Sequence, residues 1–159
     1  MNRTIRSMMK DKQWVFPEYD LRIQEKEGQQ FVWDVLRKKW VVNQPEEWVR
    51  QKLIHHLMRD RLIPAGLLSI EKEITYHGLP KRMDLVIYNR SARPEALIEC
   101  KAPEVSFTPK RIQEVLLQIS RYNDILRAPH LIITNGWQWA CFSLNEKGNY
   151  RFCPSGWYE

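Results

Sequence analysis

Residues 83–88 read MDLVIY and residues 96–101 read ALIECK, and these two stretches decide the fold. Each contains a continuous apolar run, which is typical of a strand in the middle of a sheet that is covered on both faces. Three charges interrupt the runs: Asp84 in the first stretch, and Glu99 and Lys101 in the second. A charged side chain in a buried strand is costly unless it is paired or binds a metal. If the two strands form a hairpin, Asp84 and Glu99 converge at one end of the sheet.

The sequence on either side of these stretches predicts an alternation of helices and strands. One helix begins at Asn43-Gln44-Pro45, because Pro is tolerated in a first turn and acids at positions 46 and 47 suit the positive end of the helix dipole. Apolar residues at three- and four-residue spacing mark its buried side, and they mark a second helix at about residues 109–127. The predicted strands lie at about residues 67–76, 82–88, 95–101, 130–134, 137–144 and 150–153.

The N-terminal part of the chain predicts a β-hairpin before the first helix. Apolar residues alternate on both sides of Glu27-Gly28 between residues 19 and 42, and this alternation places each set on one face of a strand. We therefore expect residues 1–42 to be an extension whose hairpin packs on a core of residues 43–159, in a single domain overall. Residues 1–13 are polar, and we expect them to be loose.

Composition narrows the classes of protein that fit. The chain has 159 residues, 43% of them hydrophobic, with a net charge of +6 and a pI of about 9.3, which favours a polyanionic partner such as nucleic acid. Three scattered cysteines with no CxxC pair argue against a disulfide framework or a structural zinc site. No signal peptide and no apolar run of membrane-spanning length is present, so we expect a soluble cytoplasmic protein without a membrane partner.

The three charges that interrupt the strands suit phosphodiester hydrolysis. Asp84 and Glu99 could hold a hard divalent cation through oxygen ligands, with the backbone carbonyl of Cys100 as a further ligand. Such a cation polarises the phosphoryl oxygen and lowers the pKa of its bound water. Lys101 could orient the attacking water, stabilise charge in the transition state, or act as a base if its pKa is depressed. The alternative is a buried salt bridge that serves only the fold.

Asp84 followed by Glu99-Cys100-Lys101 after a hairpin resembles the D…(D/E)xK signature of the PD-(D/E)XK nucleases. The spacing of fifteen positions between the two acids suits that motif, while Met83 stands where the nominal proline would be. The resemblance implies an α/β (α+β) fold with a restriction-endonuclease-like αβββαβ core, in which helices flank a mixed central sheet.

Two helical segments strengthen the resemblance. Gln118 and Tyr122 fit the QxxxY element that some of these nucleases carry beside the catalytic centre, although a satisfied glutamine and a tyrosine at the core edge are the alternative. Glu46 and Arg50 resemble the ExxxR segment in the N-terminal nuclease domain of type I restriction enzyme R subunits. The resemblance implies that Glu46, with Glu47 in reserve, completes the metal shell; plain first-turn acids are the alternative. The resemblance covers residues 43–143. A chain of 159 residues is too short to hold an ATP-driven motor as well, so we expect a stand-alone nuclease.

Other residues carry weaker signals. The second predicted helix carries Lys110, Arg111, Arg121 and Arg127, which would contact DNA phosphates or form a solvated basic face. Trp137 and Trp139 would share one face of a strand, where packing is favoured over stacking on bases. His55 and His56 are adjacent and diverge on a helix, so they make a poor metal pair.

The leading hypothesis is an Mg²⁺-dependent DNA nuclease, with Mn²⁺ as a substitute. The alternative is a nucleic-acid-binding or interaction module of a restriction or repair assembly that does not cut. A third and poorer hypothesis is an enzyme acting on RNA or on a small phosphate ester. Cutting both strands needs a homodimer or sequential nicks, and a motor or specificity protein would be a separate partner. The sequence does not distinguish an endonuclease from an exonuclease.

Overall fold

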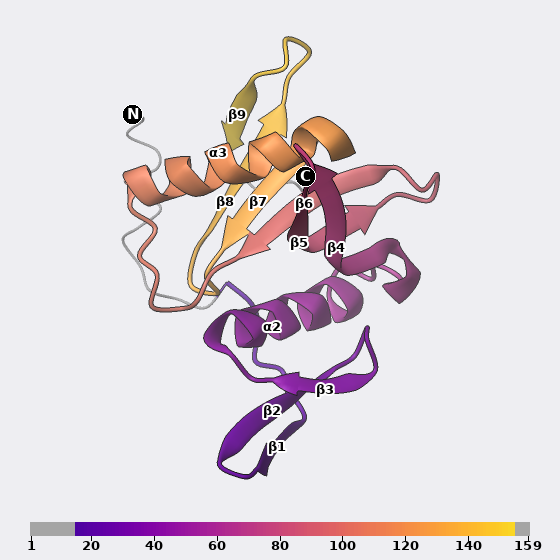
Figure 1. Cartoon of the computed structure of the whole chain (residues 1–159), viewed down its shortest axis with the longest axis vertical. Coiled ribbons are helices and arrows are strands. Elements are labelled where there is room, and N and C mark those ends of the chain that lie inside the picture. The colour runs from indigo at the N-terminus through magenta and orange to yellow at the C-terminus, as the bar shows by residue number, and fades with distance from the viewer. Residues whose placement is uncertain (1–14, 155–159) are drawn as a thin grey trace.

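The computed structural model describes residues 15–154. Residues 1–14, with the segment predicted to be loose, and residues 155–159 lie outside the described residues. Within this range the chain forms two β-sheets and two α-helices (Figure 1). The helices are α2 (Pro45–Arg59) and α3 (Pro109–Leu126), with a short 3₁₀ turn (Ala65–Leu67) after α2. Neither of the two described helices is long and apolar enough to cross a membrane.

The larger sheet contains six strands in the order β4-β5-β6-β7-β8-β9. Its strands are β4 (Leu68–Tyr76), β5 (Leu79–Tyr88), β6 (Pro94–Cys100), β7 (His130–Thr134), β8 (Trp139–Leu144) and β9 (Tyr150–Cys153). All neighbours are antiparallel except β6 and β7, which are parallel and are joined by the α3 crossover. The order α2, β4, β5, β6, α3, β7 confirms the predicted αβββαβ core and its mixed sheet.

The two helices cover opposite faces of the six-stranded sheet (Figure 1). Alternate residues of the central strands face one helix or the other. Those that pack with α3 are Val86, Leu97, Leu131 and Ile133. Those that pack with α2 are Leu85, Ile87, Ala96, Ile98 and Ile132. The continuous apolar runs in the sequence are therefore explained by burial on both faces, as predicted.

Local interactions at its ends account for the bounds of α3. Thr108 is the N-cap, and its side-chain oxygen accepts a hydrogen bond from the backbone N–H of Arg111 at 3.2 Å, with Pro109 in the first turn. At the other end the Asn123 side chain bonds the backbone N–H and carbonyl of Ala128, both at 2.8 Å. Arg127 closes the helix in the left-handed conformation, with φ of 58°.

The N-terminal region is a three-stranded antiparallel sheet, so the prediction of a two-stranded hairpin was incomplete. Its strands are β1 (Ile23–Lys26), β2 (Gln29–Asp34) and β3 (Lys39–Val42). The predicted turn at Glu27-Gly28 joins β1 to β2, with both residues at positive φ. The second turn was missed because it contains no Gly, Pro or Asn. There the Asp34 carboxylate accepts hydrogen bonds from the backbone N–H groups of Leu36 and Arg37, which ends β2.

The strand predicted from Trp137 begins at Trp139 instead. The Asn135 side chain accepts hydrogen bonds from the backbone N–H groups of Trp137 and Gln138, at 3.0 and 2.9 Å, and this widens the expected two-residue turn into a loop. The prediction that Trp137 and Trp139 lie on one strand was therefore wrong. Trp139 packs on the α2 side of the core and meets Phe16 edge to face, which agrees with the expected packing role.

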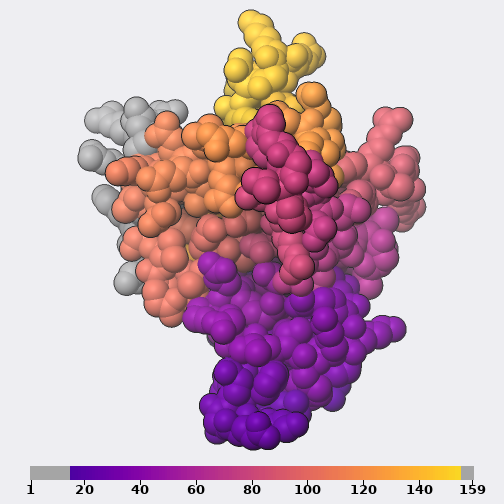
Figure 2. Space-filling view, in the orientation of Figure 1, coloured from indigo at the N-terminus to yellow at the C-terminus, as the bar shows by residue number. Residues whose placement is uncertain are grey.

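Helix α2 lies between the two sheets, which explains its unusual set of buried side chains (Figure 1). The N-terminal strands and α2 gather at one end of the molecule (Figure 2). Apolar residues of α2 such as Val49, Leu53 and Leu57 pack on the six-stranded sheet. The helix also buries six polar or charged residues: Glu47, Arg50, Gln51, Lys52, His55 and His56. A helix covered on both sides must satisfy such groups with partners from the surrounding elements.

Candidate active site

The structure brings Asp84, Glu99 and Lys101 together where the pairing of β5 with β6 ends. The last regular pair of that ladder is Leu85 with Ile98, and the two acids come directly after it. The Asp84 Oδ2 atom accepts a hydrogen bond from the backbone N–H of Cys100 at 2.7 Å. Lys101 Nζ donates to Glu99 Oε1 at 2.8 Å. The convergence expected from the two strands is therefore present.

The Glu99 carboxyl group is the most perturbed acid of this cluster. Its residue is 9% exposed, and burial together with the nearby Asp84 carboxylate raises the pKa of Glu99 to about 7. The hydrogen-bonded Lys101 ammonium opposes this rise. The two carboxylates repel each other where little water screens their charges. A bound cation would offset this repulsion.

Lys101 stays protonated in this environment. Burial alone would lower the pKa of Lys101, but the surrounding carboxylates together outweigh burial and raise that pKa, with the charge and hydrogen bond of Glu99 as the largest contributions. The charges of Glu46 and Asp84 add to the rise. A neutral lysine acting as a base would need a depressed pKa, so the electrostatics favour the two roles that use an ammonium group.

Glu46 and Glu47 lie in different surroundings at the start of α2. Glu46 is exposed, and its charge contributes to the raised pKa values of Glu99 and Lys101. Glu47 is buried and accepts hydrogen bonds from Arg50 at 2.9 Å, Gln51 at 2.9 Å and Arg37 at 3.2 Å. Glu47 is thus occupied by partners, whereas Glu46 is exposed and acts on the cluster through its charge.

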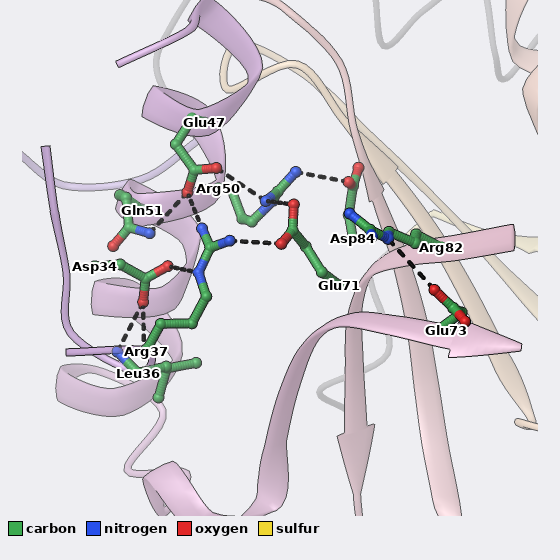
Figure 3. Close-up of polar contacts among 10 residues, drawn as sticks. All are labelled: Asp34, Leu36, Arg37, Glu47, Arg50, Gln51, Glu71, Glu73, Arg82 and Asp84. Carbon is green, nitrogen blue, oxygen red and sulfur yellow. Dashed lines mark hydrogen bonds and ion pairs between the residues drawn. The ribbon is translucent and has the colours of Figure 1, made fainter. Parts of the chain in front are cut away.

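Arg50 is the residue of this site that the sequence interpretation left without a role. Its Nη2 atom donates to Asp84 Oδ1 at 2.8 Å (Figure 3). Because the backbone N–H of Cys100 donates to Oδ2, both oxygens of Asp84 have a donor. A signal for this was present, because Arg50 precedes Leu53 and Leu57 at the spacing of the buried side of α2. A charge in a buried helical stripe predicts a buried partner, as a charge in a buried strand does.

Gln118 and Tyr122 lie on α3 without a direct bond to the acidic cluster. Gln118 is exposed, and the Tyr122 ring packs at the edge of the α3-side core, edge to face with Tyr76 at 6.1 Å. Among residues 15–154 no hydrogen bond or ion pair joins either side chain to Asp84, Glu99 or Lys101. Their supporting role stays a prediction.

The basic residues of α3 predicted to contact DNA are all exposed. Lys110 and Arg121 lie on the solvent side of the helix, and Arg111 pairs with Glu114 at 3.3 Å. Arg127, at the C-terminal end, is also exposed. Exposure agrees with phosphate contacts and with a solvated basic face alike, so the assignment stays a prediction.

The adjacent histidines of α2 are packed side chains, as expected. The His55 ring stacks on Tyr19, with centroids 5.8 Å apart. His56 Nδ1 lies 2.9 Å from an oxygen of Asp60, which also accepts a hydrogen bond from the Tyr19 hydroxyl group. The two rings therefore serve the contact between α2 and the preceding segment.

The donor set of the cluster suits a hard divalent cation with few protein ligands. Within the described residues, no group of three or more His, Cys, Asp or Glu side chains is arranged to hold a metal ion. Asp84 and Glu99 offer two carboxylates, and Mg²⁺ typically binds one or two carboxylates while it keeps several waters. The residues present thus fit Mg²⁺ better than a metal that requires a full protein cage.

The fold and this cluster define a class: a restriction-endonuclease-like αβββαβ protein with two acids and a lysine where β5 and β6 diverge. The family model described as "type I restriction enzyme R protein N terminus" matches residues 45–155. The chain therefore belongs to that family. Comparison with curated proteins found no match. The matched range begins at α2, so the three-stranded sheet lies before it.

Proposed function

We propose that this protein is a metal-dependent nuclease that hydrolyses DNA phosphodiester bonds. The observation that carries the proposal is the cluster of Asp84, Glu99 and Lys101 at one end of a buried sheet, with the pKa of Glu99 raised by burial and by Asp84. Perturbed acids gathered at one point are characteristic of functional sites. Membership of a restriction-enzyme family supports DNA as the substrate.

The side chains divide the work by their chemistry. Asp84 and Glu99 would hold Mg²⁺, or Mn²⁺ in its place, with Glu46 and the carbonyl of Cys100 as further oxygen donors. The cation would neutralise charge on the phosphoryl group and lower the pKa of a bound water. Lys101, kept protonated beside Glu99, orients the attacking water and stabilises negative charge on the phosphate.

The DNA would approach this end of the sheet under electrostatic attraction. Lys110, Arg111 and Arg121 are exposed on α3 and would contact phosphates, while Gln118 and Tyr122 would support the strand near the site. Cutting both strands would require two copies of the chain or two successive nicks. Separate motor or specificity subunits are the partners to expect from the family. The free cysteines, Cys100, Cys141 and Cys153, fit a reducing compartment such as the cytoplasm.

Cleavage of supercoiled plasmid and linear DNA, with Mg²⁺ or Mn²⁺ and with chelator, tests the proposal. We expect the wild-type chain to cut only with metal, and Asp84→Ala and Lys101→Ala each to lower the rate by about 10²-fold or more, because each removes a group aimed at the reacting phosphate. Matched controls are Glu73→Ala and Lys72→Ala on the exposed part of β4, which should keep the wild-type rate.

Each result of this assay has a distinct meaning. Equal cleavage by the wild type, Asp84→Ala and Lys101→Ala would contradict the assignment of the site. Salt-dependent DNA binding without cleavage under any metal condition would favour the alternative, a binding module of a larger assembly. The hydrogen bond from Arg50 to Asp84 supports this alternative, because it occupies one oxygen of a proposed metal ligand.

A further inference from the structure

A network of ion pairs runs from Asp84 away from the proposed site and reaches the N-terminal sheet (Figure 3). We name it the arginine bridge, and its members are Asp34, Arg37, Glu47, Arg50, Glu71 and Asp84. They come from the end of β2 and the turn after it, from α2, from β4 and from β5. The bridge thus connects a sheet outside the family match with an acid of the proposed site.

Arg37 is the centre of the bridge on the N-terminal side. Its three guanidinium nitrogens contact three carboxylates: Asp34 at 2.5 Å, Glu71 at 2.6 Å and Glu47 at 3.2 Å. Its side chain is only 18% exposed, so these contacts are poorly screened by water. Planar guanidinium groups are suited to such multiple contacts in fixed directions, whereas an ammonium group is not.

Arg50 has more carboxylates around it than it can serve equally. Its Nη1 atom lies 2.9 Å from Glu47 and 3.5 Å from Glu71, and its Nη2 atom donates to Asp84 at 2.8 Å. The bridge contains two cations and four carboxylates, so Glu47 and Glu71, once without Arg37, would compete with Asp84 for Arg50. Glu71 is the competitor whose contact can still shorten, because its oxygen lies 3.5 Å from Arg50 Nη1, whereas Glu47 already bonds that atom at 2.9 Å.

The backbone explains why Glu71 and Asp84 enter the bridge. Glu71 has a positive φ of 50°, and the β4–β5 ladder pairs Ile70 and Lys72 but leaves Glu71 and Asp84 between them unpaired. Because the β5–β6 ladder also ends before Asp84, its carboxylate takes the backbone N–H of Cys100. Any rotation of Asp84 toward solvent would break this bond, so the Cys100 amide proton reports the position of the Asp84 carboxylate.

We propose that Arg37 is a positioning residue of the site: it neutralises Glu47 and Glu71, and this leaves Arg50 to fix the Asp84 carboxylate. The N-terminal sheet is then a working part of the site, although it lies outside the family match. The significance of Asp84 for cleavage rests on the proposed function, but the coupling from Arg37 to Asp84 does not.

The test is the amide proton shift of Cys100 in the full chain, measured by ¹H–¹⁵N NMR without metal. Arg37→Met should move this shift toward the value in Asp84→Ala, because Glu71 draws Arg50 away from Asp84. With Mg²⁺, the same variant should cut DNA about 10- to 100-fold more slowly, as losses of groups that orient a metal ligand do. Arg22→Met is the matched control, directly before β1 of the same sheet. Arg22 lies over the Trp33 ring at 4.9 Å and is not in the bridge, so the Cys100 shift and the cleavage rate should stay at their wild-type values.

A second substitution separates positioning from simple structural support. If Glu71 is the competitor, adding Glu71→Gln to Arg37→Met should return the Cys100 shift and most of the cleavage rate toward wild type. A purely structural role of Arg37 would let Glu71→Gln restore stability, but it predicts no return of the Cys100 shift. If Arg37→Met does not fold, Arg37→Lys takes its place, with a smaller shift in the same direction expected because one ammonium group cannot meet three carboxylates.

The two proposals fail in different ways. An unmoved Cys100 shift in the Arg37 variant, or a moved shift that Glu71→Gln does not reverse, overturns the coupling, whatever the cleavage assay gives. A wild-type chain that cuts nothing overturns the proposed function, while the Cys100 shift still decides the coupling.

Discussion

Buried charge is the dominant theme at the scale of single residues. Asp84 accepts from Arg50 and from the Cys100 backbone, and Glu99 accepts from Lys101, so each acid has a charge-assisted hydrogen bond. A buried ion pair contributes little net stability, but the loss of one partner costs about 3–5 kcal/mol because a charge stays behind without compensation. The positions of these charges therefore indicate function more than they indicate stability.

His55 makes the stability of the fold sensitive to acid. Burial, aided by Arg59, lowers the pKa of His55, so the folded state favours the neutral ring. This contribution is fully present above the ordinary histidine pKa of about 6.5 and is lost as the pH falls through the lowered value. Glu99 acts in the opposite direction, because its pKa of about 7 makes the fold more stable as the pH falls, but it does so in both proteins. We therefore expect the unfolding free energy of His55→Phe, measured in urea, to rise relative to that of the wild type from pH 7.5 to 5.5; the Phe ring can still stack on Tyr19.

The control for this prediction is His77→Asn, at an exposed position with a φ of 49° that Asn tolerates. It should keep the pH dependence of the wild type, because it leaves the buried ring of His55 in place. An identical pH dependence for wild type and His55→Phe would show that burial of His55 does not penalise its protonation.

The sequence predicted those residues of the site that interrupt a recognisable apolar pattern. Asp84, Glu99 and Lys101 stand out because they interrupt apolar runs that only a buried strand explains. Arg37 does not stand out in this way, because charges on turns are usually solvated, and Arg50 is marked only by its place on the apolar stripe of α2. Their burial depends on a second sheet that covers α2, and no local pattern specifies that covering.

At the scale of elements, the β1–β2 hairpin turns through a residue poorly suited to its conformation. Glu27 has φ of 52° and Gly28 has φ of 74°, which corresponds to the type I′ turn that favours Asn-Gly. We expect Glu27→Asn to raise the unfolding free energy by about 0.5–1 kcal/mol, since Asn adopts positive φ at lower cost. Urea unfolding measures this change.

The same substitution on the adjoining strand is the control for Glu27→Asn. Glu25 is exposed and extended in β1, where Asn is a poor strand former, so Glu25→Asn should be neutral or destabilising. Equal effects of the two substitutions would mean that the conformation of the turn is not what limits the stability of the hairpin.

Elements with strong periodicity or explicit turn residues were predicted closely, and elements set by side-chain bonds were not. The strand at His130–Thr134 and the helix between Pro109 and Leu126 follow their apolar patterns. Strand β3 was missed because the Asp34 side chain makes the preceding turn. The start of β8 was misplaced because Asn135 caps a wider loop than its Asn-Gly pair predicts.

At the scale of the whole molecule, the N-terminal sheet and the core share both apolar and ionic contacts. Phe16 and Leu36 pack on the α2-side core, and Arg37 joins the carboxylates of Glu47 and Glu71. A fragment limited to residues 45–159 would lose all three partners. We expect its unfolding free energy to be lower than that of the whole chain by about 3 kcal/mol or more, as measured by chemical denaturation.

Neutralising the two carboxylates that lose Arg37 tests how much of this loss in unfolding free energy comes from ionic contacts. Glu47→Gln with Glu71→Gln in the same fragment should recover part of the stability, because an uncharged amide costs less than a carboxylate that has lost its Arg37 partner. A fragment as stable as the whole chain would contradict the integration of the N-terminal sheet with the core.

The positive φ of Glu71 in β4 also affects how two copies of the chain could associate. Strand β4 forms an edge of the six-stranded sheet, with β5 as its neighbour in the described residues, and an edge strand offers unpaired backbone groups to other chains. The left-handed Glu71, followed by the exposed charges of Lys72 and Glu73, breaks the flat edge that a second chain would need in order to add a strand. Two copies of this chain that cooperate on the two strands of DNA would therefore meet through another surface than the edge of β4.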